Sequence, residues 1–83
     1  MSISTRSQMR AARALLGWSQ LDLASRAGVS LPTIKRLEPG DEVLTGSHQT
    51  IEAIRRALED AGVIFVAENG EGPGVRLRKA RPE

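Results

Sequence analysis

Gln20-Leu-Asp-Leu-Ala-Ser-Arg-Ala-Gly-Val-Ser-Leu-Pro-Thr-Ile-Lys-Arg-Leu-Glu38 is the stretch that decides the fold of this 83-residue chain. Its pattern predicts two short helices joined by a tight turn. Ser19 is placed to cap the first helix, with Asp22 three residues later in the position of a capping box. Gly28 follows where the chain needs a left-handed residue, which ends that helix. Ser30 is then placed to cap the second helix.

The apolar residues of this stretch predict that the two helices cross closely. Ala24 supplies a small side chain at the crossing, which suits two helices that meet at roughly 90–120° through a turn of about 3–4 residues. Val29 is placed to fill the corner between them. Ile34 and Leu37 form an apolar stripe on the second helix, so its opposite face is left free for a partner. The residues expected on that outer face are Pro32, Thr33, Lys35 and Arg36.

This arrangement resembles the helix-turn-helix of the phage Cro and repressor (XRE-type) regulators. The matching residues are Gln20, Ala24, Gly28, Val29, Ser30, Ile34, Leu37 and Glu38. The resemblance implies a mostly α fold, a four-helix repressor-like domain that contains the helix-turn-helix. The alternative is an ordinary corner between two helices of a small bundle.

The resemblance also implies a set of DNA contacts. The second helix of the motif would lie in the major groove with its N-terminal residues at the base edges. Gln20 and Ser30 would meet phosphates and fix the angle of approach. Arg36 is the leading candidate for a bidentate contact to guanine, and Lys35 could do the same or bind phosphate. Apolar contact to thymine methyl groups would come from Pro32, Thr33 and Leu31.

Two of these assignments stay open at this point. Leu31 lies three residues before Ile34, so it has the spacing of a core residue as well as that of a DNA contact. The target sequence cannot be transferred from relatives that read adenine with glutamines, because Leu31 and Pro32 stand at those positions.

A first helix is predicted to run from a cap at Ser4 or Thr5 to about residue 16, where Gly17 ends it. Arg6 and Arg10 are expected to point outward from this helix. Its buried stripe is predicted to comprise Met9, Ala12, Leu15 and Leu16.

Arg13 and Glu38 occupy the positions at which the resemblance implies an ion pair between the first helix and the end of the recognition helix. Such a pair would also hold Arg13 near a DNA phosphate. The alternative is two separately solvated charges. Pro39 and Gly40 end the recognition helix, and the loop that follows carries acidic residues where relatives often have basic ones. That loop is therefore a poor candidate for a phosphate clamp.

A fourth helix is predicted from a cap at Ser47 to about Ala61, with Gly62 as its stop. Its apolar positions, Ile51, Ile54 and Leu58, have helical spacing. Ser47 and His48 are candidate phosphate contacts because they lie at the N-terminus of the helix, where backbone N–H groups are free.

The C-terminal residues predict a β-hairpin, with strands over 63–68 and 75–79 and a glycine-rich turn between them. The first strand is apolar on both faces, and an isolated hairpin is only marginally stable. We therefore expect the hairpins of two chains to join, strand beside strand or face to face, in a symmetric dimer. The alternative is a hairpin folded back on its own helices. The candidate dimerisation residues are Val63, Ile64, Phe65, Val66, Val75 and Leu77.

Composition narrows the class of protein. Residues 1–40 hold six basic and two acidic residues, whereas residues 41–62 hold two basic and five acidic ones. Positive charge on the motif half favours a polyanion such as double-stranded DNA. The chain has no Cys and a single His, so neither a catalytic constellation nor a metal or cofactor site is expected. No signal peptide or membrane span is evident, and a cytoplasmic location is the expectation.

We expect residues 1–62 to form the DNA-binding part and residues 63–83 to form the hairpin and a basic tail. The predicted function is a sequence-specific transcriptional regulator, a repressor that binds an inverted-repeat operator as a homodimer with half-sites about one helical turn apart. One alternative is an antitoxin-like autoregulator whose hairpin binds a protein partner. The other is a protein-interaction adaptor that no longer binds DNA. An enzyme is not expected.

Overall fold

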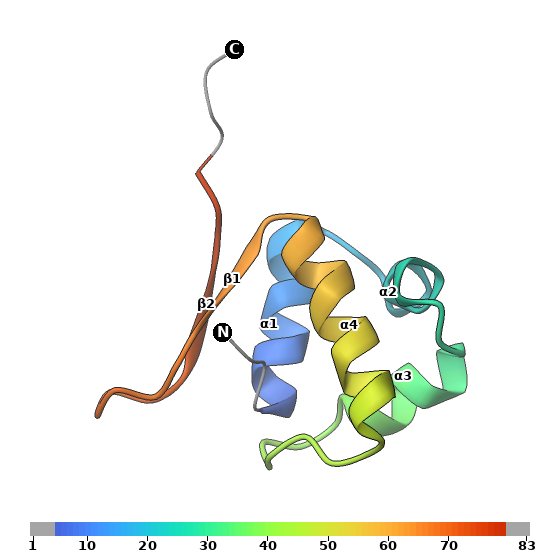
Figure 1. The fold of residues 1–83 in the computed structure, drawn as a ribbon, viewed down its shortest axis with the longest axis horizontal. Helices are drawn as coiled ribbons and strands as arrows, with labels where there is room; N and C mark the ends of the chain where they lie inside the picture. Colours follow the sequence, from blue (N-terminus) through green and yellow to red (C-terminus); the bar gives the residue numbers. More distant parts are fainter. Residues whose placement is uncertain (1–4, 80–83) are drawn as a thin grey trace.

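The structure is a computed structural model that describes residues 5–79, so Ser4 and Arg81 lie outside the described residues. Four helices are followed by two strands, which confirms the predicted mostly α fold with a C-terminal hairpin (Figure 1). The elements are α1 (Arg6–Leu16), α2 (Gln20–Ala27), α3 (Leu31–Leu37), α4 (His48–Asp60), β1 (Val63–Val66) and β2 (Gly74–Leu77).

Each helix begins at the polar residue that the sequence predicted as its cap. Thr5 Oγ1 accepts the N–H of Gln8 at 3.1 Å, and Ser19 Oγ accepts the N–H of Asp22 at 3.0 Å. Both pairs are closed as capping boxes by a return bond to the backbone of the cap residue. The hydroxyls of Ser30 and Ser47 accept N–H groups in the first turns of α3 and α4. The boundaries of the helices therefore follow from local chemistry.

One apolar core joins the helices to the hairpin. Helix α2 packs against α3 and α4, and the hairpin packs against α1 and α4 (Figure 1). Leu44, from the loop between α3 and α4, also lies in this core. Leu15 was predicted to be buried and is 44% exposed, because it lies at the margin of the apolar stripe of α1. The buried apolar residues are Met9, Ala12, Leu23, Ala24, Ile34, Leu37, Leu44, Ile54, Leu58, Val63 and Phe65.

The hairpin folds back on the helices of its own chain. Strands β1 and β2 pair antiparallel, and Gln8 Nε2 on α1 donates to the carbonyl oxygen of Gly74 at 2.9 Å. Val63 and Phe65 are only 1% exposed, so these two predicted dimer contacts are wrong: the core of a single chain already covers them. Ile64 and Val66 point to the opposite face, where they are partly exposed.

The hairpin and α3 lie on opposite sides of the helical body in Figure 1. Since β1 and β2 pack on α1 and α4, neither strand covers the outer face of α3. The fold thus leaves two separate surfaces, one on α3 and one on the hairpin.

Candidate nucleic-acid interface

Helix α3 is anchored by its inner side and exposed on its outer side. Ile34 and Leu37 are buried, whereas Lys35 and Arg36 are exposed. Within residues 5–79 the side chains of Lys35 and Arg36 form no hydrogen bond or ion pair, so their charges are available to a partner. Leu31 is partly buried against the core, which favours its role as a core residue over contact with DNA.

The N-terminal end of α3 presents small polar and apolar groups beside these charges. Ser30 Oγ accepts the N–H of Thr33 at 3.3 Å and lies 2.7 Å from Thr33 Oγ1. Pro32 is exposed between them. The hydroxyl of Ser30 is thus engaged in capping, and Pro32 offers an apolar surface at the start of the outer face.

Arg13 and Glu38 form the ion pair that the sequence predicted. Arg13 Nε and Nη2 donate to the two carboxylate oxygens of Glu38 at 2.7 and 2.9 Å, and Glu38 is 2% exposed. Arg13 Nη1 donates to the carbonyl oxygen of Trp18 at 2.8 Å. Each of the three guanidinium nitrogens therefore already has an acceptor within the chain, which makes Arg13 a positioning residue.

Gln20 belongs to the same network, a link that the sequence did not indicate. Gln20 Nε2 donates to Glu38 Oε1 at 3.0 Å. The carboxylate of Glu38 thus connects α1, the start of α2 and the end of α3. It orients the amide of Gln20, which keeps a second amide hydrogen for a phosphate.

Arg6 and Arg10 do not point outward, and that prediction is wrong. Arg6 Nη1 donates to the carbonyl oxygens of Leu37 and Arg36 at 2.7 and 3.2 Å. Arg10 Nη1 donates to the carbonyl oxygens of Glu38 and Gly40. The last carbonyls of a helix have no partner within it and carry its negative end, so guanidinium groups are well matched to them.

Arg6, Arg10 and Arg13 form what we call the arginine row, since they recur at a spacing of four and three residues on one side of α1. A helix of seven residues is too short to be stable on its own. The arginine row therefore holds the C-terminal end of α3, while Ile34 and Leu37 hold its inner side.

The acidic loop after α3 also contacts the arginine row. Asp41 Oδ1 lies 3.1 Å from Arg10 Nη2, and Glu42 Oε2 lies 3.8 Å from Arg6 Nε. These carboxylates balance the two arginines that cross from α1. The acidic character of this loop is thus explained by interactions within the chain.

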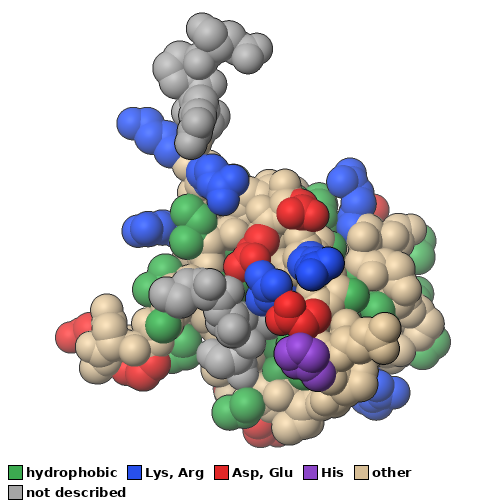
Figure 2. Space-filling model, in the orientation of Figure 1, with side chains coloured by type: hydrophobic (Ala, Val, Ile, Leu, Met, Phe, Trp, Pro, Cys, Tyr) green, Lys and Arg blue, Asp and Glu red, His purple; other side chains and the backbone are tan. Residues whose placement is uncertain are grey.

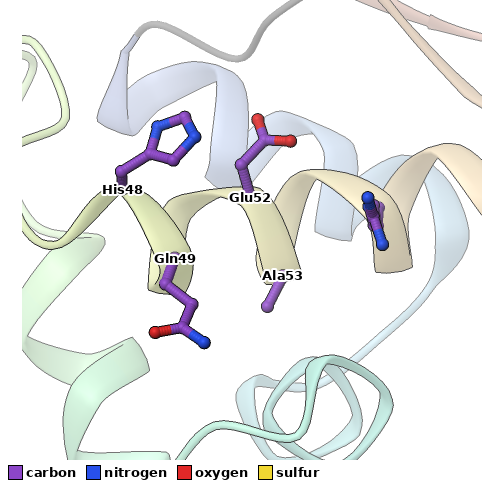
Figure 3. Close-up of a pocket in the computed structure, with 5 residues that line it drawn as sticks. His48, Gln49, Glu52 and Ala53 are labelled. Atoms are coloured by element: carbon purple, nitrogen blue, oxygen red, sulfur yellow. The ribbon is translucent and has the colours of Figure 1, made fainter.

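The N-terminus of α4 is open to solvent. Ser47 and His48 are exposed, and a shallow depression of about 400 Å³ lies beside His48, Gln49 and Glu52 (Figure 3). The side-chain hydrogen bond from Arg55 holds the pKa of the Glu52 carboxyl below its usual value. Glu52 and Arg56 line this depression together with His48, and acidic, basic and histidine side chains lie close together on this face in Figure 2, so its charge is mixed. In the described part of the chain no three His, Cys, Asp or Glu side chains are grouped to hold a metal.

A family model described as helix-turn-helix matches residues 9–48. Residues 9–48 are an XRE-type helix-turn-helix. Domains of this family are DNA-binding regulatory domains and are generally not enzymes. The match begins within α1 and ends at the first residue of α4, so it covers the arginine row in part and α3 completely. A search of curated proteins finds no match to the chain.

None of the helices within residues 5–79 has the length and apolar character that a membrane span requires.

The sequence located the helix-turn-helix and its outer face, but it missed the contacts that fix α3. The sequence predicts that Arg6 and Arg10 point outward, because they lie away from the apolar stripe of α1. Their common spacing with Arg13 was the available signal, since a residue four positions away on a helix shares its face. Gln8 and Leu44 carried no comparable signal.

Proposed function

We propose that this regulator is a homodimeric repressor that reads an inverted-repeat operator with the outer face of α3. The observation that carries the proposal is that Lys35 and Arg36 are exposed and unpaired within the described residues, while Ile34 and Leu37 are buried behind them. Two positive charges on the exposed face of an anchored helix are suited to the major groove, which is wide enough to admit one α-helix.

The proposal gives each residue of the interface a role. Arg36 donates two hydrogen bonds to a guanine, and Lys35 binds a phosphate or a second guanine. Pro32 and Thr33 contact thymine methyl groups. Gln20, held by Glu38, donates its remaining amide hydrogen to a phosphate and thereby sets the angle of α3 in the groove. Additional phosphate contacts come from the first turn of α4, at Ser47 and His48.

Repression by occlusion of a promoter is the regulatory outcome that we propose. Two copies double the base contacts that a seven-residue helix can make. The acidic loop was the feature that favoured an adaptor without DNA binding. Asp41 and Glu42 face Arg10 and Arg6, which removes that reason to prefer an adaptor.

Selection of bound duplexes from a random oligonucleotide pool tests the proposal. It should return an inverted repeat, and the affinity for that duplex should fall steeply with salt while remaining well above the affinity for random DNA. Lys35→Ala should reduce the salt slope by about 1 if Lys35 binds a phosphate. Arg56→Ala on α4 is the matched control, since Arg56 is also exposed but lies outside the proposed interface. Recovery of no preferred sequence would contradict the proposal.

A further inference from the structure

Strand β2 has a free edge. The described residues contain a sheet of two strands only, so β2 has a neighbour on one side. The N–H of Arg78 donates to the carbonyl oxygen of Gly62 at 2.7 Å. Hydrogen bonding alternates along an antiparallel pair, so Arg76 and Gly74 also bond to β1. Val75 and Leu77 consequently direct their N–H and C=O groups away from β1, to a side where residues 5–79 supply no strand.

Two exposed leucines, Leu15 on α1 and Leu77 on β2, lie at about the same distance along their elements from the bond between Gln8 and Gly74. The bond from Gln8 to Gly74 sets α1 and β2 level with each other, and both run in the same direction in Figure 1. Leu15 lies seven residues further along α1, or about 10.5 Å, and Leu77 lies three residues further along β2, or about 10 Å. They are 44% and 45% exposed. The free edge is therefore accompanied by apolar surface that the chain itself does not cover.

The charges at the two ends of β2 are opposite in sign. The loop before β2 carries the exposed carboxylates of Glu68 and Glu71, and the end of β2 is followed by the exposed side chains of Arg78 and Lys79. A second β2 placed antiparallel would bring each acidic loop beside a basic end. A parallel second strand would bring like charges together. The edge is thus electrostatically complementary to an antiparallel copy of itself.

We propose that β2 pairs antiparallel with β2 of a second copy of this chain, which creates a four-stranded sheet with its two-fold axis at Arg76. In this register Val75 of one copy exchanges two backbone hydrogen bonds with Leu77 of the partner subunit. Arg78 lies opposite Gly74 of the partner subunit, which has no side chain. Placing the axis at Leu77 would set Arg76 against Arg78 twice, whereas the register centred on Arg76 opposes one pair of like charges, the two copies of Arg76. The inference rests on the proposed function in one respect: a repressor that reads an inverted repeat needs two copies of α3, and this dimer supplies them.

Cysteine cross-linking tests the register directly, because the chain has no native cysteine. Directly opposed residues of a pair without mutual hydrogen bonds have Cα atoms about 4.5 Å apart, within the range of a disulfide. Arg76→Cys should therefore form a covalent dimer under mild oxidation. Arg78→Cys is the matched control, because its two copies would lie about 13 Å apart along the sheet. Equal cross-linking of both variants, or none at position 76, would overturn the proposal.

Sedimentation without DNA gives an independent measurement. Leu77→Pro removes an N–H that faces the second copy and leaves the bonds between β1 and β2 intact. It should weaken association by about tenfold or more, whereas Leu77→Val, which keeps the N–H, should change it by much less. A wild-type protein that stays monomeric, or equal association of both variants, would refute the pairing. Because DNA is absent, either result leaves the reading of DNA by α3 to be tested separately.

Discussion

Replacement of Glu38 by alanine should destabilise the protein far more than loss of an ordinary surface charge. The carboxylate is 2% exposed and accepts three hydrogen bonds, two from Arg13 and one from Gln20. In Glu38→Ala, Arg13 keeps its charge but loses its partner at a site where its side chain is 21% exposed.

The expected loss can be bounded. Removing one partner of a buried ion pair costs about 3–5 kcal/mol, and the partial exposure of Arg13 places the value near the lower end, at about 3 kcal/mol. A domain of this size unfolds with a free energy of about 4–12 kcal/mol in total. The melting temperature should accordingly fall by about 12–24 °C.

Urea denaturation followed by the fluorescence of Trp18, the single tryptophan, measures this loss. Glu71→Ala in the exposed hairpin loop serves as the control and should change the free energy of unfolding by less than about 0.5 kcal/mol. Arg13→Ala and the double variant complete a cycle that isolates the coupling between the two side chains. A loss below about 1 kcal/mol for Glu38→Ala, the range of exposed pairs, would show that the Arg13–Glu38 pair contributes no more than a surface ion pair.

Three further predictions concern the ends of the helices. Arg6→Ala should lower the free energy of unfolding by about 1–3 kcal/mol, measured by urea denaturation, because two C-terminal carbonyls of α3 lose a charged donor. Gly28→Ala should cost about 1–2 kcal/mol in the same assay, since residue 28 has φ of 70°. Hydrogen bonds from Ser19 hold the pKa of the Asp22 carboxyl below 3.8, and the bond from its backbone N–H has a larger effect than the bond from its side chain. The ionised carboxylate therefore stabilises the fold above pH 3.8 and loses this effect as the pH falls below 3.8 through the lowered pKa. The melting temperature of Asp22→Asn should approach that of the wild type over the same fall in pH.

Much of the fold follows from short-range chemistry, and that part was predictable. Polar caps, left-handed glycines and helical spacing each act within a few residues, which is why the limits of α2 and α3 could be predicted so closely. The Arg13–Glu38 pair came from the resemblance, because two charges 25 residues apart in the chain carry no local signal of contact.

The errors arose where tertiary structure decides the environment of a side chain. Val63 and Phe65 alternate as a strand should, but the pattern alone could not say whether α1 and α4 or a second chain would cover them. The position of Arg6 on α1 predicts that its side chain points outward. In the folded chain it donates to the carbonyl oxygens of the last residues of α3, which have no partner within the helix.

A base-substitution cycle shows whether the outer face of α3 reads DNA. Wild-type protein and Arg36→Ala are titrated by fluorescence anisotropy against the selected duplex and against duplexes with each base pair changed in turn. One guanine substitution should cost the wild type about 1–3 kcal/mol of binding free energy and should cost Arg36→Ala almost nothing. Identical discrimination by both proteins at every position would contradict the reading of DNA by this face.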